Sequence, residues 1–230
     1  LLASSGFVEA CSYSFVSADE NAPFASCVAG AAPVISNALG EPFTTMRSTP
    51  VVGLLRAARH NVRRGLSDLA LFEVGRSYAL VAGHPVESRR AAVLLHGRRG
   101  THWAAESRPA DFHDGSGAVA ALFAGFGAPA PELRPATLPF LAPGRSAEVV
   151  SGGAVVGWVG VLSGSLAAAW DLGEAVVADV DVAAIPVPPP PSAVEMPSRF
   201  PGSDVDLTVT HPLSVAWKTL DEAVRTDAPA

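Results

Sequence analysis

Residues 43–78 constrain the fold more than any other part of the chain. Two hydroxyl residues at 48–49 precede Pro50, an order typical of a helix start, because a hydroxyl can cap free N–H groups and proline fits the first turn. Apolar residues then recur at helical spacing up to residue 62, and Gly65 is the expected end of the helix. An apolar run at 69–74 has the composition of a buried strand. The pattern predicts a helix, a short link and a core strand.

The predicted helix is basic, although the whole chain has a formal net charge of -6. Its basic side chains are Arg56, Arg59, His60, Arg63 and Arg64. Their spacing of three and four residues places them on one face, opposite an apolar stripe that includes Leu55. One interpretation is the solvated face of a surface helix. The other is an interface with acidic groups of another subunit or with RNA phosphates, for which Arg47, Leu55 and the basic residues are the candidates.

Glu73 is a carboxylate inside the predicted buried strand, between Phe72 and Val74. Burial of a carboxylate is costly unless a basic group pairs with it. Arg76 and Arg47 are the nearest plausible partners along the sequence, and we predict a structural core pair of Glu73 with Arg76. A ligand-binding role for Glu73 is the alternative, because functional sites also bury carboxylates.

A short acidic cluster, Asp111, His113 and Asp114, precedes an apolar segment. The favoured interpretation is a cap at a helix N-terminus, where carboxylates interact well with free N–H groups and the helix dipole. The alternative is a metal or acid–base site. The sequence has no phosphate-binding loop, dinucleotide-binding glycine motif or HExxH motif, so we expect none of these nucleotide or zinc sites in this chain.

Two cysteines, Cys11 and Cys27, lack the CxxC or histidine spacing of a zinc site. We expect both to be buried or half-buried free thiols of a reducing compartment. No apolar run approaches the roughly 20 residues of a membrane span. The chain does not begin with Met, which favours a fragment of a longer protein.

The mixture of antiparallel strands with few helices predicts an α+β fold. Further strands are expected at 8–15, 33–36, 91–95, 133–136, 147–150, 154–162 and 175–182, and helices at 118–126 and 166–170. We expect a core module at 1–185 and a proline-rich, semi-rigid linker at 186–197. Residues 198–230, with a strand at 206–210 and a helix at 214–225, are too few for a complete domain.

The order of these motifs resembles the β subunit of bacterial phenylalanyl-tRNA synthetases. The motifs are GFVEACSYSF at 6–15, NALGE at 37–41, MRSTPVVGLL at 46–55, LALFEVGRSY at 69–78, PGRSA at 143–147, VGWVG at 156–160 and SRFP at 198–201. Each motif is modest alone, but together they cover nearly the whole chain in order. Ala38, Ser116, Ala142 and Val205 depart from the usual residues of the family and mark a divergent member.

The resemblance implies a class II aminoacyl-tRNA synthetase fold for 1–185, an antiparallel sheet flanked by helices. It implies that 198–230 begin a ferredoxin-like anticodon-binding domain. In this family the α subunit carries aminoacylation, so the module is expected to be non-catalytic and to support α-subunit assembly and tRNA(Phe) binding in a cytoplasmic hetero-oligomer. The helix at 49–64 falls where the family places a subunit interface. ATP and magnesium are expected to bind elsewhere in the full enzyme.

Two other functions stay open at this point. An active class II ligase-like enzyme would bind ATP and an amino acid in this module, and the resemblance then requires an arginine on the second motif strand and a glycine-rich strand followed by arginine. We find no such glycine-rich strand, because 155–162 lead into Ser163 and Gly164. A free-standing RNA-binding domain derived from the same fold is the third possibility.

Overall fold

The computed structural model describes residues 1–38, 40–100, 103, 106–189, 200–202 and 205–227. The chain separates into two compact units, Leu1–Pro189 and Pro190–Ala230. The division falls inside the predicted linker, whose residues 190–197 lie outside the described part of the chain. Within the described residues of the second unit, one helix is present, α5 (Trp217–Asp227).

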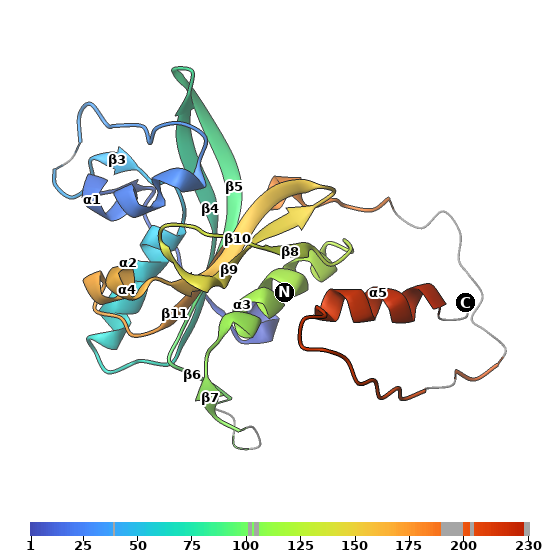
Figure 1. Ribbon diagram of the computed structural model, residues 1–230. Helices are drawn as coiled ribbons and strands as arrows, with labels where there is room; N and C mark the ends of the chain where they lie inside the picture. The colour runs from blue at the N-terminus through green and yellow to red at the C-terminus, as the bar shows by residue number, and fades with distance from the viewer. Residues whose placement is uncertain (39, 101–102, 104–105, 190–199, 203–204, 228–230) are drawn as a thin grey trace. The chain divides into compact units, whose positions relative to one another are not determined.

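A seven-stranded sheet forms the centre of the first unit, in the order β1-β4-β5-β11-β10-β9-β8 (Figure 1). Its strands are β1 (Val8–Glu9), β4 (Leu69–Val81), β5 (His84–His96), β8 (Glu132–Pro135), β9 (Leu141–Ser151), β10 (Ala154–Leu162) and β11 (Ala175–Asp181). All neighbours are antiparallel except β1 and β4, which are parallel. The sheet is therefore mixed at one edge, a correction to the purely antiparallel sheet that the sequence predicts.

Two pairs of short strands accompany the large sheet. They are β2 (Phe15–Val16) with β3 (Thr45–Met46), and β6 (Arg98–Arg99) with β7 (Arg108–Pro109). The helical elements of this unit are η1 (Ala3–Ser5), α1 (Ala18–Asn21), η2 (Ala22–Cys27), α2 (Val51–Val62), α3 (Phe112–Gly125), α4 (Gly164–Ala169) and η3 (Val182–Ala184).

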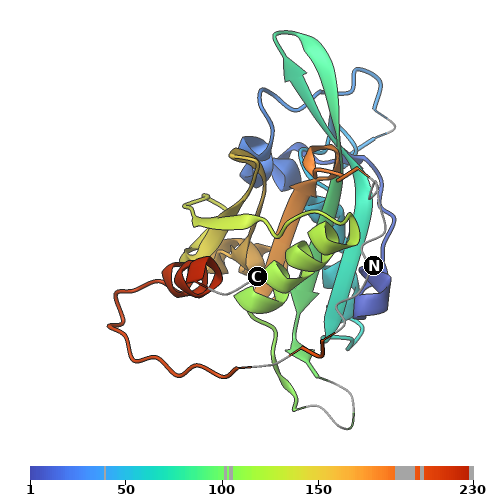
Figure 2. The ribbon, with the colours of Figure 1, turned by 90° about the vertical axis from the view of Figure 1, so that its right-hand side faces the viewer.

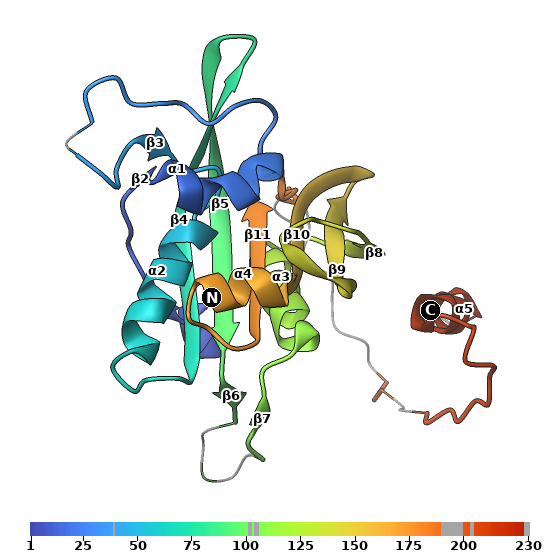
Figure 3. The same ribbon diagram turned by 60° about the vertical axis from the view of Figure 1, so that its left-hand side comes forward.

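Helices cover both faces of the sheet. Helix α3 lies on one face (Figure 2), whereas α2 and α4 lie on the other (Figure 3). Alternate strand residues point to opposite faces, so Phe72 packs in the α3 core and its neighbour Leu71 packs in the α2 core. Phe123 anchors α3 in the first core, and Leu54 anchors α2 in the second. Helix α2 thus packs on the face of the sheet to which Leu71 of β4 points.

The first turn of α2 is fixed by Thr49. Its Oγ1 atom accepts a hydrogen bond from the Val51 N–H group at 3.2 Å and donates one to Asp179 Oδ2 at 2.7 Å. Both Thr49 and Asp179 are fully buried, so this bond ties the start of α2 to β11. The predicted place of the helix start is confirmed, but Pro50 occupies the N-cap position and the helix begins at Val51, so proline is not inside the first turn as predicted.

Several predicted elements differ from the structure. The predicted strand at 69–74 is part of the longer strand β4, and the predicted helix at 118–126 begins at Phe112. The predicted strand at 33–36 is wrong, since only an isolated bridge joins Val34 to Thr45. No strand forms at 206–210, although all of these residues are described. In the described part of the chain, no helix is long and apolar enough to cross a membrane.

Candidate interaction surface around helix α2

A buried ion pair lies beneath the N-terminal end of α2. Arg47 Nη1 is 2.7 Å from Glu73 Oε1, and their side chains are 2% and 5% exposed. Ser12 joins both groups, because its hydroxyl donates to Glu73 Oε2 at 2.6 Å and accepts from Arg47 Nη1 at 2.8 Å. Arg47 Nε donates to the Arg76 carbonyl at 2.9 Å. Every charge in this group has a partner, so it holds three distant chain segments together.

Two glycines make room for this network. A Cβ atom at Gly53 on α2 would collide with the Ser12 hydroxyl, and one at Gly75 on β4 would collide with the Arg47 guanidinium. Both positions therefore require the smallest residue while the ion pair is in place. Glycine in a helix or strand interior is otherwise unfavourable, which makes the close approach the reason for its presence here.

Arg76 is not the partner of Glu73, and this corrects the predicted core pair. The Arg76 side chain is exposed and forms an ion pair with Glu87 across the β4–β5 hairpin. The burial and pairing of Glu73 are confirmed, but the partner is Arg47. Arg47 was also a candidate for contact with RNA or a subunit. Since it is buried within its own chain, its side chain has no surface for such a contact.

Leu55 is likewise fully buried, in the core between α2 and the sheet. The apolar stripe of the helix packs against its own module, which corrects the expectation that Leu55 faces a partner. The outward side of α2 carries the remaining candidates, which we call the arginine face: Arg56, Arg59, His60, Arg63 and Arg64.

The arginine face is partly neutralised by carboxylates of the same chain. Glu20 forms an ion pair with Arg56 and lies 3.8 Å from Arg59, and Arg63 forms an ion pair with Asp171. Burial raises the pKa of Glu20, but the hydrogen bond and charge of Arg56 outweigh it and leave the pKa below its ordinary value. The face therefore remains positive, with four arginines against these two carboxylates.

Aromatic rings extend the arginine face in two directions. The Arg59 guanidinium lies over the Trp170 ring, 4.9 Å from its centroid, and Arg56 lies over the Phe43 ring at 5.6 Å. At the far end of α2, Arg64 Nη1 lies 2.8 Å from His60 Nδ1, and both residues are exposed. Cation–π contacts of this kind attract guanidinium groups to the faces of aromatic rings.

Phe43 also belongs to an aromatic hollow of about 560 Å³, lined by Tyr13, Phe15, Ile35 and Phe43 among others. The Tyr13 and Phe43 rings meet edge to face with centroids 6.0 Å apart, and Tyr13 is 74% exposed. The hollow borders β2 and β3, which lie beside α1 and above α2 in Figure 3. Sequence reasoning missed this hollow, although aromatic residues on both sides of the 37–41 turn were an available signal.

The acidic cluster at 111–114 is a helix cap, as predicted. Asp111 accepts from the His113 and Asp114 N–H groups, and Asp114 Oδ2 accepts from the Asp111 N–H group at 2.9 Å. Arg108 forms an ion pair with Asp114 at 2.7 Å. Burial raises the pKa of Asp114, but these hydrogen bonds outweigh it and hold the pKa below its usual range. The carboxylates are thus engaged by the helix and by Arg108.

The α2 side of the sheet offers little space next to the β4–β5 hairpin. A hollow of about 140 Å³ lies there, lined by Cys27, Ser77, Ala79 and Arg90 among others. Arg90 is tied to buried Asp179 by a 2.8 Å bond. Burial, and then the charge of Asp179, raises the pKa of the Cys27 thiol. Small-molecule sites usually occupy about 300–1,000 Å³, so this hollow is too small for a nucleotide.

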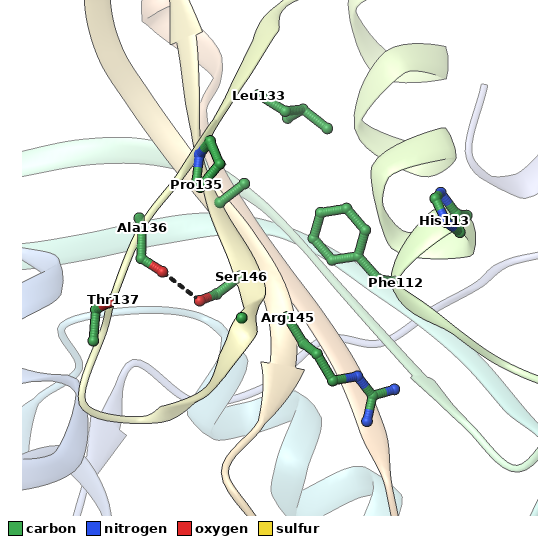
Figure 4. A pocket seen from close by; sticks show the side chains of 10 residues that line it. Phe112, His113, Leu133, Pro135, Ala136, Thr137, Arg145 and Ser146 are labelled. Carbon is green, nitrogen blue, oxygen red and sulfur yellow. Dashed lines mark hydrogen bonds between the residues drawn. The ribbon is translucent and has the colours of Figure 1, made fainter. Parts of the chain in front are cut away.

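A larger hollow of about 570 Å³ opens on the other face, between β8, β9 and the start of α3 (Figure 4). Its walls include Phe112 and Leu133, and the Ser146 hydroxyl donates to the Ala136 carbonyl at 2.6 Å. Arg145 extends away from the Phe112 ring in Figure 4 and makes two bonds of 2.6 Å to Glu174. The arginine and the serine hydroxyl of this hollow are therefore already engaged within the chain.

Comparison with known proteins points to one family. The sequence of residues 1–182 matches the protein-family model described as the phenylalanyl tRNA synthetase beta chain CLM domain. The chain is 34% identical over 196 residues to the phenylalanine–tRNA ligase beta subunit of Xanthomonas campestris pv. campestris (strain 8004), covering 84% of this chain and 24% of the relative. The chain is 35% identical over 181 residues to the phenylalanine–tRNA ligase beta subunit of Geobacillus kaustophilus (strain HTA426), covering 76% of this chain and 22% of the relative. The chain spans about a quarter of the length of these relatives.

The fold is similar to a solved aminoacyl-tRNA synthetase structure. PylSc of Desulfitobacterium hafniense, a pyrrolysyl tRNA synthetase, aligns with a TM-score of 0.58 and 15% identity over 78% of this chain and 59% of that chain. At this identity the similarity concerns the fold alone. It agrees with the synthetase-type α+β fold that the sequence resemblance implied.

Proposed function

The chain belongs to the family of phenylalanyl-tRNA synthetase beta chains, and we propose that residues 1–185 form a module without chemistry of its own that helps to assemble the ligase. Its partner is then the α subunit of a cytoplasmic hetero-oligomer, and tRNA(Phe) is the RNA that the assembled enzyme charges. ATP and magnesium bind elsewhere in the complete enzyme. The assignment of residues 198–230 to a ferredoxin-like anticodon-binding domain rests on the sequence resemblance and is part of this proposal.

The contact between Arg56 and Phe43 is the observation that carries the assembly role. It joins the arginine face to the aromatic hollow, so that arginines and exposed rings form one continuous surface. Arginine and aromatic residues are enriched at the centres of protein interfaces and dominate their binding energy. This surface therefore has the composition of a protein-binding surface rather than that of an ordinary solvated helix face.

RNA is the second candidate for the same surface. Glu20 and Asp171 neutralise part of the arginine charge, which weakens attraction to phosphates. His60 and Arg64, at the end of α2, are exposed and would be the residues that contact RNA.

The small hollow on the sheet face next to the β4–β5 hairpin supports the proposal that this module has no catalytic activity. Its hollow of about 140 Å³ is too small for ATP, and Arg90 there is engaged by Asp179. The active-ligase alternative predicts micromolar ATP binding to this chain. Isothermal titration of ATP should therefore show no heat of binding, and clear micromolar binding would favour an active ligase.

Co-expression with the α subunit tests the assembly role. Tyr13→Asp and Arg64→Glu alter the surface without touching the buried core, so both variants should fold and lose copurification with the α subunit. Arg134→Glu is the matched control, because Arg134 is a half-exposed arginine on β8, at the opposite edge of the sheet. Unchanged complexes with Tyr13→Asp and Arg64→Glu would refute the proposal. If Arg64→Glu leaves the complex intact but weakens a salt-dependent binding of tRNA, RNA is favoured as the ligand of this surface.

A further inference from the structure

The β4–β5 hairpin carries two arginines directly opposite each other. Arg76 and Arg89 are register partners across the strands. Every second residue of β4 shares a face, so Arg76 lies on the same side as Phe72, the side that α3 covers further along the sheet. The hairpin runs past the end of α3 in Figure 2, and the Arg76 and Arg89 side chains are both exposed. Like charges directly opposite in an antiparallel pair destabilise it.

This arginine pair is only half neutralised. Arg76 forms an ion pair with Glu87 on β5. The Arg89 side chain makes no ion pair or hydrogen bond with any residue that the structure describes. Among the described residues, the Arg89 guanidinium therefore has no counter-ion, and it lies beside the second guanidinium of Arg76. An added carboxylate would relieve the repulsion between them.

A shallow hollow lies between the two arginines. It has a volume of about 310 Å³ and is lined by Val74, Gly75, Arg76 and Arg89. Val74 is 43% exposed, so its apolar side chain is open to solvent beside the arginines. The hollow thus offers donors for an anion and an apolar wall at the same place.

We propose that this hollow receives a carboxylate side chain, flanked by an apolar residue, from an acidic segment of a partner protein. Guanidinium groups match carboxylates through paired hydrogen bonds, and Val74 supplies the apolar contact. RNA fits less well, because the positive charge is confined to two residues and Glu87 lies beside them. The site faces away from the α2 surface and does not depend on the proposed function.

Binding of a labelled decamer of L-glutamate, measured by fluorescence anisotropy at low salt, tests this site. Arg89→Gln should weaken binding by about threefold to fivefold, the change expected for one exposed charged contact. Arg134→Gln is the matched control and should leave the dissociation constant unchanged, because Arg134 lies on β8, away from the hairpin. Glu87→Gln should strengthen binding, since it removes the competing carboxylate.

Three outcomes would overturn the inference. The first is no binding of the glutamate decamer at millimolar concentration, and the second is equal binding by Arg89→Gln and the original chain. The third is tighter binding of a decamer of uridylate that is lost in Arg89→Gln, which would make the site an RNA contact. Since the α subunit takes no part in this experiment, its result is separate from the assembly test.

Discussion

Arg47 and Glu73 form an ion pair with a distance of 2.7 Å from Nη1 to Oε1, in a place where both side chains are almost fully buried. Arg47 precedes α2, and Glu73 lies in β4. Their partner Ser12 comes from the N-terminal segment. The pair therefore fixes the position of α2 on the sheet, and with it the position of the arginine face.

Removal of one charge from this pair should destabilise the protein strongly. Glu73→Gln leaves the Arg47 guanidinium buried without a counter-ion, and we expect a loss of about 3–5 kcal/mol in the free energy of unfolding. The double change Arg47→Met with Glu73→Leu should cost less than Glu73→Gln, because no charge remains buried. Urea denaturation followed by circular dichroism measures both effects.

Arg76→Ala is the control for this pairing. Arg76 is exposed and pairs with Glu87 at the surface, where ion pairs contribute little. Its replacement should leave the urea midpoint unchanged. A loss as large as that of Glu73→Gln would instead support the pairing with Arg76 that the sequence predicts.

The predicted pair of Glu73 with Arg76 is wrong because of the geometry of a β-strand. Residues three apart in a strand point to opposite faces, so Glu73 and Arg76 cannot meet in β4. The period of the strand could have excluded this pair. The choice of Arg47 depends on where the chain before α2 crosses β4, and no local pattern encodes that crossing.

The helical pattern of the sequence predicted α2 and its apolar stripe, but it did not predict which surface packs against that stripe. Leu55 packs against the sheet of its own module. The partners of the arginine face, Glu20 and Asp171, are distant in sequence from α2. Local periodicity identifies which residues share a face, whereas the identity of the opposing surface depends on tertiary packing.

The burial of Leu55 gives a second prediction. Leu55→Ala should lower the free energy of unfolding by about 3 kcal/mol, the usual cost of a cavity at a fully buried leucine. The exposed residues of the arginine face should keep their positions, so any complex formed by the folded variant should have unchanged affinity. A stability change below about 1 kcal/mol would contradict the packing of α2 on the sheet.

Two glycines in α3 should respond in opposite directions to alanine. A Cβ atom at Gly115 would lie 2.6 Å from Val176 Cγ1, so Gly115→Ala should push α3 away from β11 and reduce stability. Apart from its chain neighbours and the nearby helix backbone, no atom of the described residues would lie within 4 Å of a Cβ atom at Gly117, and Gly117→Ala should stabilise the helix by about 0.5–1 kcal/mol. Thermal unfolding of the two variants measures the difference. Equal shifts of the same sign would contradict the contact between Gly115 and Val176.

The cap of α3 gives a dependence on pH. Because the pKa of Asp114 is lowered in the folded state, its contribution to stability is present above its unfolded pKa of about 3.9 and is lost as the pH falls through the folded pKa. Asp114→Ala should therefore cost about 1 kcal/mol at pH 7. The cost should shrink below about pH 4.

Ser116→Ala is the matched control for this dependence, since Ser116 is near the same end of α3, has no titrating group and donates its hydroxyl to the His113 carbonyl. Urea titrations of both variants at several pH values measure the effect. A cost of Asp114→Ala that stays constant from pH 7 to the acid limit would contradict the ionised cap.

The two cysteines should differ in reactivity. The structure confirms that both are free thiols, but Cys11 is exposed rather than buried, whereas Cys27 is half-buried. Burial beside the Asp179 carboxylate raises the pKa of Cys27, which keeps it in the unreactive thiol form, and thiolate is the nucleophile in alkylation. Iodoacetamide at pH 8 should therefore label native Cys11 and leave Cys27 unmodified, as measured by mass spectrometry of peptides. In the unfolded protein both should react at similar rates, and rapid native labelling of Cys27 would show that the segment carrying it opens away from the sheet.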